Sequence, residues 1–199
     1  MDAFGAGEKM KVNDSGMPNV AYWESLFDIE KIVDWVNPEL FKKPVVEIGC
    51  GYGTFTIPIA KRLKEAKVIT FDIELEMIEF TQQRIQEHGL TNIILVHQDV
   101  VEHGINQDSE TCDAVLLFNI LHFKERKQLL EEASRILSKD GFIFVIHWRS
   151  DIQTPRGPAL DIRPSPEDIL GDGRKIGLSI YGNIDILHPY HWGIKLRKE

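Results

Sequence analysis

Short runs of β-branched and aromatic residues alternate along the chain with longer segments in which apolar positions recur every three or four residues. A short apolar run is typical of a buried strand, and the longer spacing is typical of a helix that buries one face. The predicted strands are residues 45–48, 68–71, 93–96, 114–118 and 142–146, and the clearest helices between them are residues 73–87 and 125–137. Strands that alternate with helices predict a three-layer αβα, Rossmann-like fold around a mostly parallel sheet.

The segment before the first predicted strand has the pattern of a helix. Aromatic and aliphatic residues recur at helical spacing over residues 20–36, which predicts one amphipathic helix. Residues 1–19 are rich in glycine, asparagine and aspartate and offer few anchors, so we expect them to be mobile. A single domain is therefore expected over residues 20–199, with residues 20–40 as a helical N-terminal cap.

The pattern changes after the fifth predicted strand. Four X-Pro pairs make residues 150–177 too rigid and too irregular for a strand, and we expect this loop near the substrate site. Within it, Ser165 fits an N-cap, Pro166 fits the first helical position and Asp168 completes a capping box, which predicts a short helix. Two further segments then read as an antiparallel strand pair. They are residues 178–187 and 193–198.

The composition excludes several classes of protein. The chain has 199 residues, of which 43% are apolar, and this suffices for one compact domain without disulfides or metals. Its formal net charge is −8, with 23 basic residues scattered among 31 acidic ones, and this disfavours nucleic acid as a partner because binding there depends on phosphate neutralisation. No apolar stretch has the length of a signal peptide or a membrane span, and Cys50 and Cys112 do not suggest a disulfide framework. We therefore expect a cytoplasmic protein that acts neither on nucleic acid nor at a membrane.

A glycine-rich turn follows the first predicted strand directly. Gly49, Gly51 and Gly53 stand on alternate positions at the carboxyl end of a parallel strand, where open α/β sheets bind ligands. Their spacing departs from the G-x-G-x-x-G fingerprint of dinucleotide-binding proteins. Glu47, two residues before the first glycine, would repel a pyrophosphate, whereas it suits a ligand with a positive amino group.

Two more acidic residues stand at predicted strand ends. Asp72 closes the second apolar run, 25 positions after Glu47, a spacing at which adenosine-binding folds place a carboxylate on ribose hydroxyls. Asp99 follows the third apolar run. Because the carboxyl ends of parallel strands meet at one edge of a sheet, we expect these three carboxylates to belong to one site.

The segment from Val45 to Gly53 resembles the first motif of the class I S-adenosylmethionine-dependent methyltransferases of the type 11-like group, and residues 40–149 follow that family's motifs in order. The resemblance implies a seven-stranded sheet with an antiparallel last strand, S-adenosylmethionine as cofactor and S-adenosylhomocysteine as product. It places the glycine turn at the methionine part of the cofactor, the second strand end at the ribose and the third at the adenine. The implied cofactor-binding residues are Glu47, Gly49, Cys50, Gly51, Tyr52, Gly53, Asp72, Ile73, Asp99, Val100 and Asn119.

Residues for the methyl acceptor are expected at the ends of the fourth and fifth strands and in the segments that cover them. Methyl transfer is an in-line displacement, so the protein must align a nucleophile and exclude water, and a dedicated base is optional. The candidate catalytic residues are His147, Asn119 and His122, and the candidate substrate residues are Trp23, Trp148, Arg149 and Arg163. A structural histidine at position 147 and loop-bracing ion pairs of the arginines, which also include Arg156, remain open alternatives.

The sequence favours a small-molecule acceptor, because no separate substrate domain is evident and no Asn/Asp-Pro-Pro-Tyr segment follows the fourth strand. We expect a monomer or homodimer. Two alternatives stay open. One is a catalytically silent S-adenosylmethionine-binding module that acts as a sensor or interaction domain, and the other is an NAD-dependent oxidoreductase, which the glycine spacing disfavours. No metal is expected, since His188 and His191 straddle a proline without a nearby cysteine or carboxylate cluster.

Overall fold

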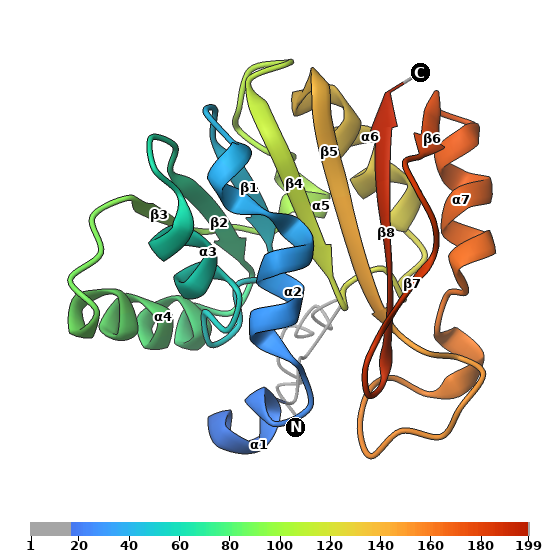
Figure 1. Ribbon diagram of the computed structural model, residues 1–199, viewed down its shortest axis with the longest axis horizontal. Coiled ribbons are helices and arrows are strands. Elements are labelled where there is room, and N and C mark those ends of the chain that lie inside the picture. Colours follow the sequence, from blue (N-terminus) through green and yellow to red (C-terminus); the bar gives the residue numbers. More distant parts are fainter. Residues whose placement is uncertain (1–16, 199) are drawn as a thin grey trace, which may run out of the picture.

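The apolar runs form the strands of one mixed sheet. The computed structural model describes residues 17–198, so the mobility expected for residues 1–19 falls almost entirely outside the described residues. The strand order is β3-β2-β1-β4-β5-β8-β6, with β7 paired to β8 beside this path (Figure 1). Strands β1 to β5 pair in parallel, and β8 runs antiparallel to β5, β6 and β7. The strands are β1 (Val45–Ile48), β2 (Val68–Asp72), β3 (Ile93–His97), β4 (Cys112–Phe118), β5 (Leu137–Trp148), β6 (Leu178–Ile180), β7 (Asp185–Leu187) and β8 (His191–Lys198).

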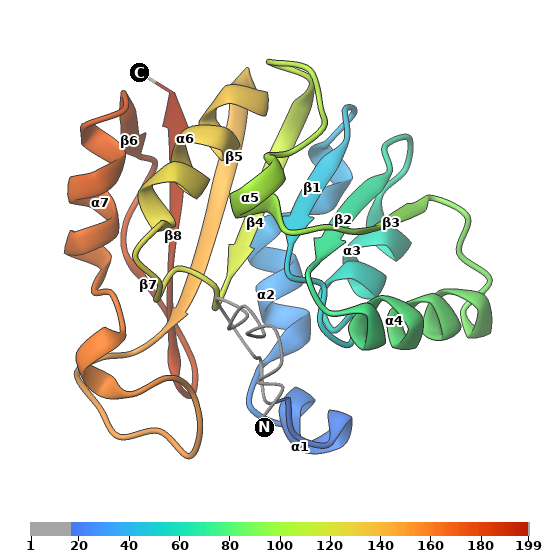
Figure 2. The same ribbon diagram turned by 180° about the vertical axis from the view of Figure 1, so that it is seen from behind.

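Helices cover both faces of this sheet. The helices are α1 (Val20–Glu24), α2 (Ile29–Val36), α3 (Thr56–Arg62), α4 (Leu75–Glu87), α5 (Val100–His103), α6 (Arg126–Ile136) and α7 (Pro166–Arg174), with short 3-10 turns η1 (Pro38–Leu40) and η2 (Leu160–Ile162). Helices α2 and α3 lie before the sheet in Figure 1, and α5 and α6 lie before it in the reverse view of Figure 2. Since successive strand residues point to opposite faces, Val45 joins the core on the α2 and α3 side and Val46 joins the core on the α6 side. The predicted three-layer αβα class is confirmed.

The strand β5 is longer than the predicted strand 142–146 and begins directly where α6 ends. Gly141 explains how the strand continues through a segment that looks like a turn. A Cβ atom at this position would lie 2.8 Å from the carbonyl oxygen of Asp113, so only glycine lets the neighbouring strand approach. Helix α4 starts at Leu75, two residues later than predicted, because Asp72 and Ile73 turn the chain out of β2.

The prediction of one helix over residues 20–36 is wrong, because the structure has two helices, α1 and α2. The side chain of Asp28 accepts a hydrogen bond from the Lys31 backbone N–H at 3.2 Å and so starts a new helix. Between the helices, Phe27 leaves helical backbone and forms an isolated antiparallel bridge with Pro189. The apolar spacing correctly predicted that this segment buries residues against the sheet, but it did not predict that the helix is interrupted.

The predicted strand 178–187 is also divided, into β6 and β7, and both pair with β8. Gly182 lies between them with a φ of +84°, a conformation that breaks the strand. This extra strand raises the sheet to eight strands while keeping the antiparallel ending that the sequence predicted. The capping box of α7 is confirmed, since the Ser165 hydroxyl accepts from the Asp168 N–H at 3.2 Å and Asp168 accepts from the Ser165 N–H at 2.8 Å.

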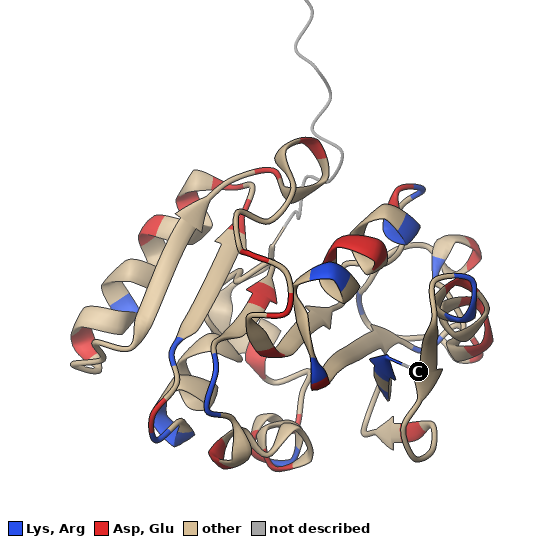
Figure 3. Ribbon diagram, turned by 90° about the horizontal axis from the view of Figure 1, so that it is seen from above, with Lys and Arg blue, Asp and Glu red and all other residues tan. Residues whose placement is uncertain are grey.

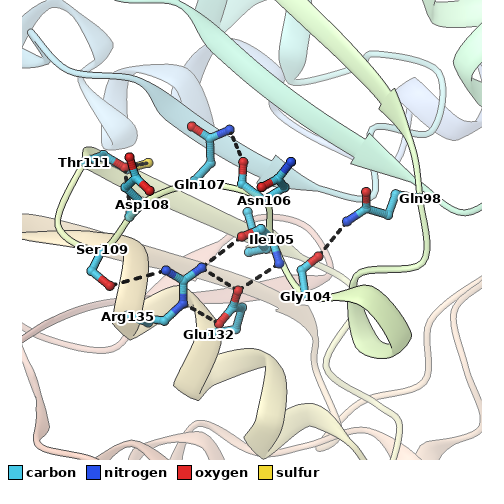
Figure 4. A network of polar contacts seen from close by, with 11 residues as sticks. Gln98, Gly104, Ile105, Asn106, Gln107, Asp108, Ser109, Thr111, Glu132 and Arg135 are labelled. Atoms are coloured by element: carbon cyan, nitrogen blue, oxygen red, sulfur yellow. Dashed lines mark hydrogen bonds and ion pairs between the residues drawn. The ribbon is translucent and has the colours of Figure 1, made fainter.

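The connection between α5 and β4 is tied to α6 by a polar network (Figure 4). Arg135 donates to the Ile105 carbonyl at 2.9 Å and to the Glu132 carboxylate at 2.7 Å, and that carboxylate accepts the Ile105 N–H at 2.8 Å. The Ile105 side chain is buried in the core below the network. The network lies near the amino-terminal end of β4, opposite the carboxyl ends of the strands that carry the candidate site.

Candidate active site

A cavity of about 580 Å³ opens at the carboxyl ends of strands β1 to β5. Its walls come from the glycine turn, the ends of β2 and β3, the segment after β4 and the loop after β5. Of the predicted site residues, the structure brings together at this cavity Trp23, Gly49, Cys50, Gly51, Asp72, Ile73, Asp99, Val100, Asn119, His122 and Trp148. Ligands of open α/β sheets bind at this place.

The glycine turn at the floor of the cavity requires its glycines. Gly49, Gly51 and Gly53 have φ values of +82°, +51° and +71°, a region that favours glycine. The Gly51 backbone is held on both sides, since its N–H donates to Asp72 at 2.9 Å and its carbonyl accepts from the Thr81 hydroxyl at 2.8 Å. A Cβ atom at Gly53 would lie 3.0 Å from Thr81, so this glycine packs against α4 and does not line the cavity.

Asp72 connects the end of β2 to the glycine turn. One carboxylate oxygen accepts the Gly51 N–H and the other accepts the Glu74 N–H at 2.9 Å. Burial raises the pKa of Asp72, and these two backbone donors oppose that rise. Each carboxylate oxygen has a second lone pair, so the group at the cavity wall can still accept hydrogen bonds from a vicinal diol such as that of a ribose.

Asp99 has a structural role as well as its place in the cavity wall. Its carboxylate accepts the Val101 N–H at 2.8 Å and the Glu102 N–H at 3.2 Å, and so caps α5. The cap presents Val100 and Gln98 to the cavity beside it. Apolar Val100 and the adjacent carboxylate form a wall suited to a flat heterocycle with a hydrogen-bond donor.

Glu47 lies below the glycine turn and not at the cavity wall, contrary to the prediction that it faces the ligand. It points toward α3, where its carboxylate accepts from the hydroxyls of Thr56 and, at 3.1 Å, of Thr70. The side chain is buried, and desolvation, with a smaller contribution from Asp72, raises its pKa to about 7 in spite of the two hydroxyl donors. Tyr52 is also absent from the wall, because its hydroxyl donates to the Pro18 carbonyl at 2.6 Å.

Asn119 and His122 bring unpaired polar atoms to the cavity. Asn119 directly follows β4 and has a left-handed backbone conformation, with φ of +60°. Its N–H still donates to the Ile146 carbonyl at 2.7 Å. Its side-chain oxygen and nitrogen, and Nδ1 of His122, are buried without a partner among the described residues. Buried polar atoms without partners are costly, so these atoms are suited to hydrogen bonds with a ligand. Burial also lowers the pKa of His122, which keeps its ring neutral.

His147 does not reach the cavity, which corrects its assignment as a residue in contact with substrate. It lies on β5 behind His122, with 5.7 Å between the ring centroids, and its side chain is fully buried. Burial lowers its pKa to about 3, and proximity to His122 adds to the effect. The position after an apolar strand predicted the depth of this residue in the sheet but not which face it would point to.

Arg149 and Arg163, two of the candidate substrate residues, also lie outside the cavity wall. Arg149 pairs with Asp151, at 2.6 Å between the closest atoms. The guanidinium of Arg163 donates to the carbonyls of Pro158 at 2.8 Å, Arg149 at 2.8 Å and Arg156 at 3.3 Å. Arg163 therefore braces the loop through backbone carbonyls, a role close to the loop-bracing alternative.

Several wall residues carry no sequence signal of their own. They are apolar or small residues that only the fold brings to the cavity: Met17, Ile48, Phe55, Phe71, Met77, Phe118, Ile120, Phe123, Leu129, Gly157, Pro158 and Ile162. Polar wall residues outside the predicted set are Thr54, Glu74, Gln98 and Arg156. The proline-rich loop was predicted to lie near the substrate site, and its residues 156–158 supply part of the wall.

Comparison with known proteins agrees with this geometry. The profile of the methyltransferase domain family matches residues 45–141. A S-adenosylmethionine-dependent methyltransferase from Aquifex aeolicus superimposes with a TM-score of 0.77 at 21% identity, over 89% of this chain and 93% of that chain. Magnesium protoporphyrin IX methyltransferase from Synechocystis PCC 6803, solved with bound S-adenosylmethionine, superimposes with a TM-score of 0.69 at 17% identity, over 95% and 88% of the two chains.

Two curated relatives match at 27% and 24% identity. (S)-coclaurine N-methyltransferase from Thalictrum flavum subsp. glaucum is 27% identical over 52% of this chain and 28% of its own length. Ribosomal RNA small subunit methyltransferase A from Staphylococcus carnosus is 24% identical over 82% of this chain and 49% of its own length. The chain thus spans half or less of these relatives. Residues 45–141 thus match the methyltransferase domain family, and the fold is similar to that of S-adenosylmethionine-dependent methyltransferases.

The described residues show three further features. Basic and acidic residues are interspersed over the helices and loops (Figure 3). In residues 17–198, no group of three or more histidine, cysteine, aspartate or glutamate side chains is arranged to hold a metal ion. Within the same residues, no helix has the length and apolar character needed to cross a membrane.

Proposed function

We propose that this chain transfers the methyl group of S-adenosylmethionine to a small-molecule acceptor bound in the same cavity. The observation that carries the proposal is the glycine turn, which Asp72 and Thr81 hold in place at the floor of a cavity built from the ends of strands β1 to β5. When bound, the cofactor supplies an electrophilic methyl group on a sulfonium sulfur. The chain's own residues then bind, orient and shield the reacting groups.

The cofactor-binding roles follow from the positions of the wall residues. Gly49 and Gly51 bring backbone close to the ligand at the methionine end, and a Cβ atom at Gly49 would already lie 3.1 Å from Ile120. Asp72 is placed to accept from the ribose hydroxyls, and Asp99 with Val100 is placed to bind the adenine. These assignments rest on the resemblance to the methyltransferase family, and the hydrogen-bonding capacity of each group and its place in the wall support them.

The acceptor is a small molecule in this proposal. The loop after β5 and helix α1 close over the strand ends, so the acceptor end of the cavity is walled by Trp23, Gly157 and Pro158. The net charge of −8 disfavours a polyanion, and basic and acidic residues are interspersed along the described chain in Figure 3. One curated relative is named as a ribosomal RNA methyltransferase, so RNA belongs in the test.

Of the three candidate catalytic residues His147, Asn119 and His122, we assign the reacting atom to Asn119 and His122. Both line the cavity and both carry buried polar atoms without partners among the described residues. A neutral imidazole accepts a proton, and burial favours the neutral ring of His122. We assign to His122 the proton that leaves the acceptor, and to Asn119 the orientation of the nucleophilic atom.

The test is transfer of label from S-adenosylmethionine, labelled on its methyl group, to a panel of phenols, amines and thiols, with ribosomal RNA as a separate arm. The proposal predicts label in a small molecule and none in RNA. Label in RNA alone contradicts the small-molecule assignment. Saturable cofactor binding without transfer to any acceptor favours a silent cofactor-binding module instead.

A further inference from the structure

The end of the cavity away from the acidic strand ends has an aromatic wall. Trp23 of α1, Phe55 before α3, Phe118 of β4 and Trp148 of β5 all line it. The rings contact each other edge to face, with centroids 5.1 Å apart for Phe55 and Phe118 and 6.3 Å apart for Trp23 and Trp148. Four segments that are distant in sequence thus contribute one ring each to the wall, as two edge-to-face pairs.

The wall is rigid where Trp148 forms it. This side chain is 2% exposed and packs on His191 at 4.2 Å between ring centroids. On its other side the loop after β5 presses closely, since a Cβ atom at Gly157 would lie 2.9 Å from the indole. Arg163 holds that loop through three carbonyls and places its guanidinium 5.9 Å from the same ring. A preformed aromatic surface of this kind favours a flat ring over a flexible chain.

The charges around the cavity disfavour a cationic acceptor. Among the described residues, the carboxylates of the wall are Asp72, Glu74 and Asp99, and all three lie at the ends of β2 and β3, where the adenosine is assigned. The sulfonium itself carries a positive charge, so an ammonium acceptor would meet a like charge, while the carboxylates of the described wall lie at the adenosine end.

We infer that the acceptor is a flat aromatic hydroxy compound, whose ring lies on the wall of Trp23, Phe55, Phe118 and Trp148 while its hydroxyl meets Asn119 and His122. This inference rests on the proposed function. Asn119 directly follows Phe118 in the chain, so the polar pair adjoins the aromatic wall. In the reaction the acceptor oxygen forms a bond to the methyl carbon and the carbon–sulfur bond breaks with its electron pair on sulfur. The hydroxyl proton passes to His122 and then to solvent.

The experiment titrates three probes into the full chain saturated with S-adenosylhomocysteine, with binding measured by calorimetry. The probes are 2-naphthol, its saturated counterpart decahydro-2-naphthol, and 1,2,3,4-tetrahydroisoquinoline as a flat amine that is cationic at pH 7. We expect 2-naphthol to bind about three- to tenfold more tightly than the saturated alcohol, the gain typical of aromatic contacts, and the amine to bind most weakly. Equal affinity of the two alcohols, preference for the amine, or no binding of any probe overturns the inference.

A matched pair of variants locates the binding. Trp23→Leu removes one ring of the wall and is expected to abolish the preference for 2-naphthol, whereas Tyr22→Leu, at an exposed neighbouring position of the same helix, is expected to keep it. Preference retained in Trp23→Leu overturns the placement on this wall. If S-adenosylhomocysteine itself does not bind, the proposed function fails. The same titrations on the cofactor-free chain then still decide the aromatic preference.

Discussion

Glu47 makes a quantitative prediction about stability and pH. Its carboxyl group is buried below the glycine turn between Thr56 and Thr70, and its pKa is raised from 4.5 to about 7, mainly by burial. A group whose folded pKa lies above its unfolded value stabilises the fold fully below the unfolded value, and this stability is lost as the pH rises through the folded value. At about 1.36 kcal/mol per pKa unit, ionisation of Glu47 lowers the free energy of unfolding by about 3 kcal/mol between pH 4.5 and pH 8.

The variant Glu47→Gln isolates this effect, because an amide keeps the carbonyl acceptor for the two hydroxyls and does not ionise. The assay is urea unfolding of both proteins at pH 5 and pH 8. On going from the lower to the higher pH, we expect the stability of the variant relative to the wild type to rise by about 2–3 kcal/mol. The exposed substitution Glu65→Gln should show no comparable change. An equal response of Glu47→Gln and wild type to pH would refute the assignment of a buried carboxyl that titrates near neutrality.

Three further predictions follow from the site and the core. Asp72→Ala should weaken S-adenosylmethionine binding, measured by calorimetry, by about 1–3 kcal/mol, because hydrogen bonds to a charged group are lost, and unchanged affinity would exclude the ribose role. Gly53→Ala should lower the free energy of unfolding by about 1–2 kcal/mol beyond Gly89→Ala, since both glycines have positive φ but only Gly53 would bring a Cβ atom within 4 Å of a neighbour, Thr81. Burial lowers the pKa of His191 to about 3, so its stability contribution is present above its ordinary value of 6.5 and is lost as the pH falls below it. As the pH falls from 6.5 to 5, the free energy of unfolding of His191→Phe should therefore rise by about 2 kcal/mol relative to that of the wild type, measured by urea unfolding. A difference between the two proteins that does not change with pH would contradict a buried neutral imidazole.

The central sheet was predictable because its strands are buried on both sides and read as unbroken apolar runs. The run at Val45 has the same bounds in sequence and structure, and the glycine turn after it needs the backbone conformation that only glycine adopts readily. The edges of the fold were less predictable. The break at Phe27 depends on a bridge to Pro189, a partner remote in the sequence, and apolar spacing carries no information about such a contact.

The site was predictable where a residue type is needed for chemistry and not where the fold alone places it. Asp72 and Asp99, which line the cavity, were predicted because a carboxylate that closes an apolar run is unusual. Phe55 and Phe118 were missed because an aromatic residue in a core segment looks the same whether or not a cavity lies beside it. His147 was misplaced because one step along a strand exchanges the two faces of the sheet.

The central claim is that the cavity at the strand ends binds S-adenosylmethionine. The most direct measurement is calorimetric titration of the purified chain with S-adenosylmethionine, S-adenosylhomocysteine and NADH in parallel. The account predicts saturable binding of the first two at one site per chain and no binding of NADH. Binding of NADH alone, or of none of the three, would contradict it.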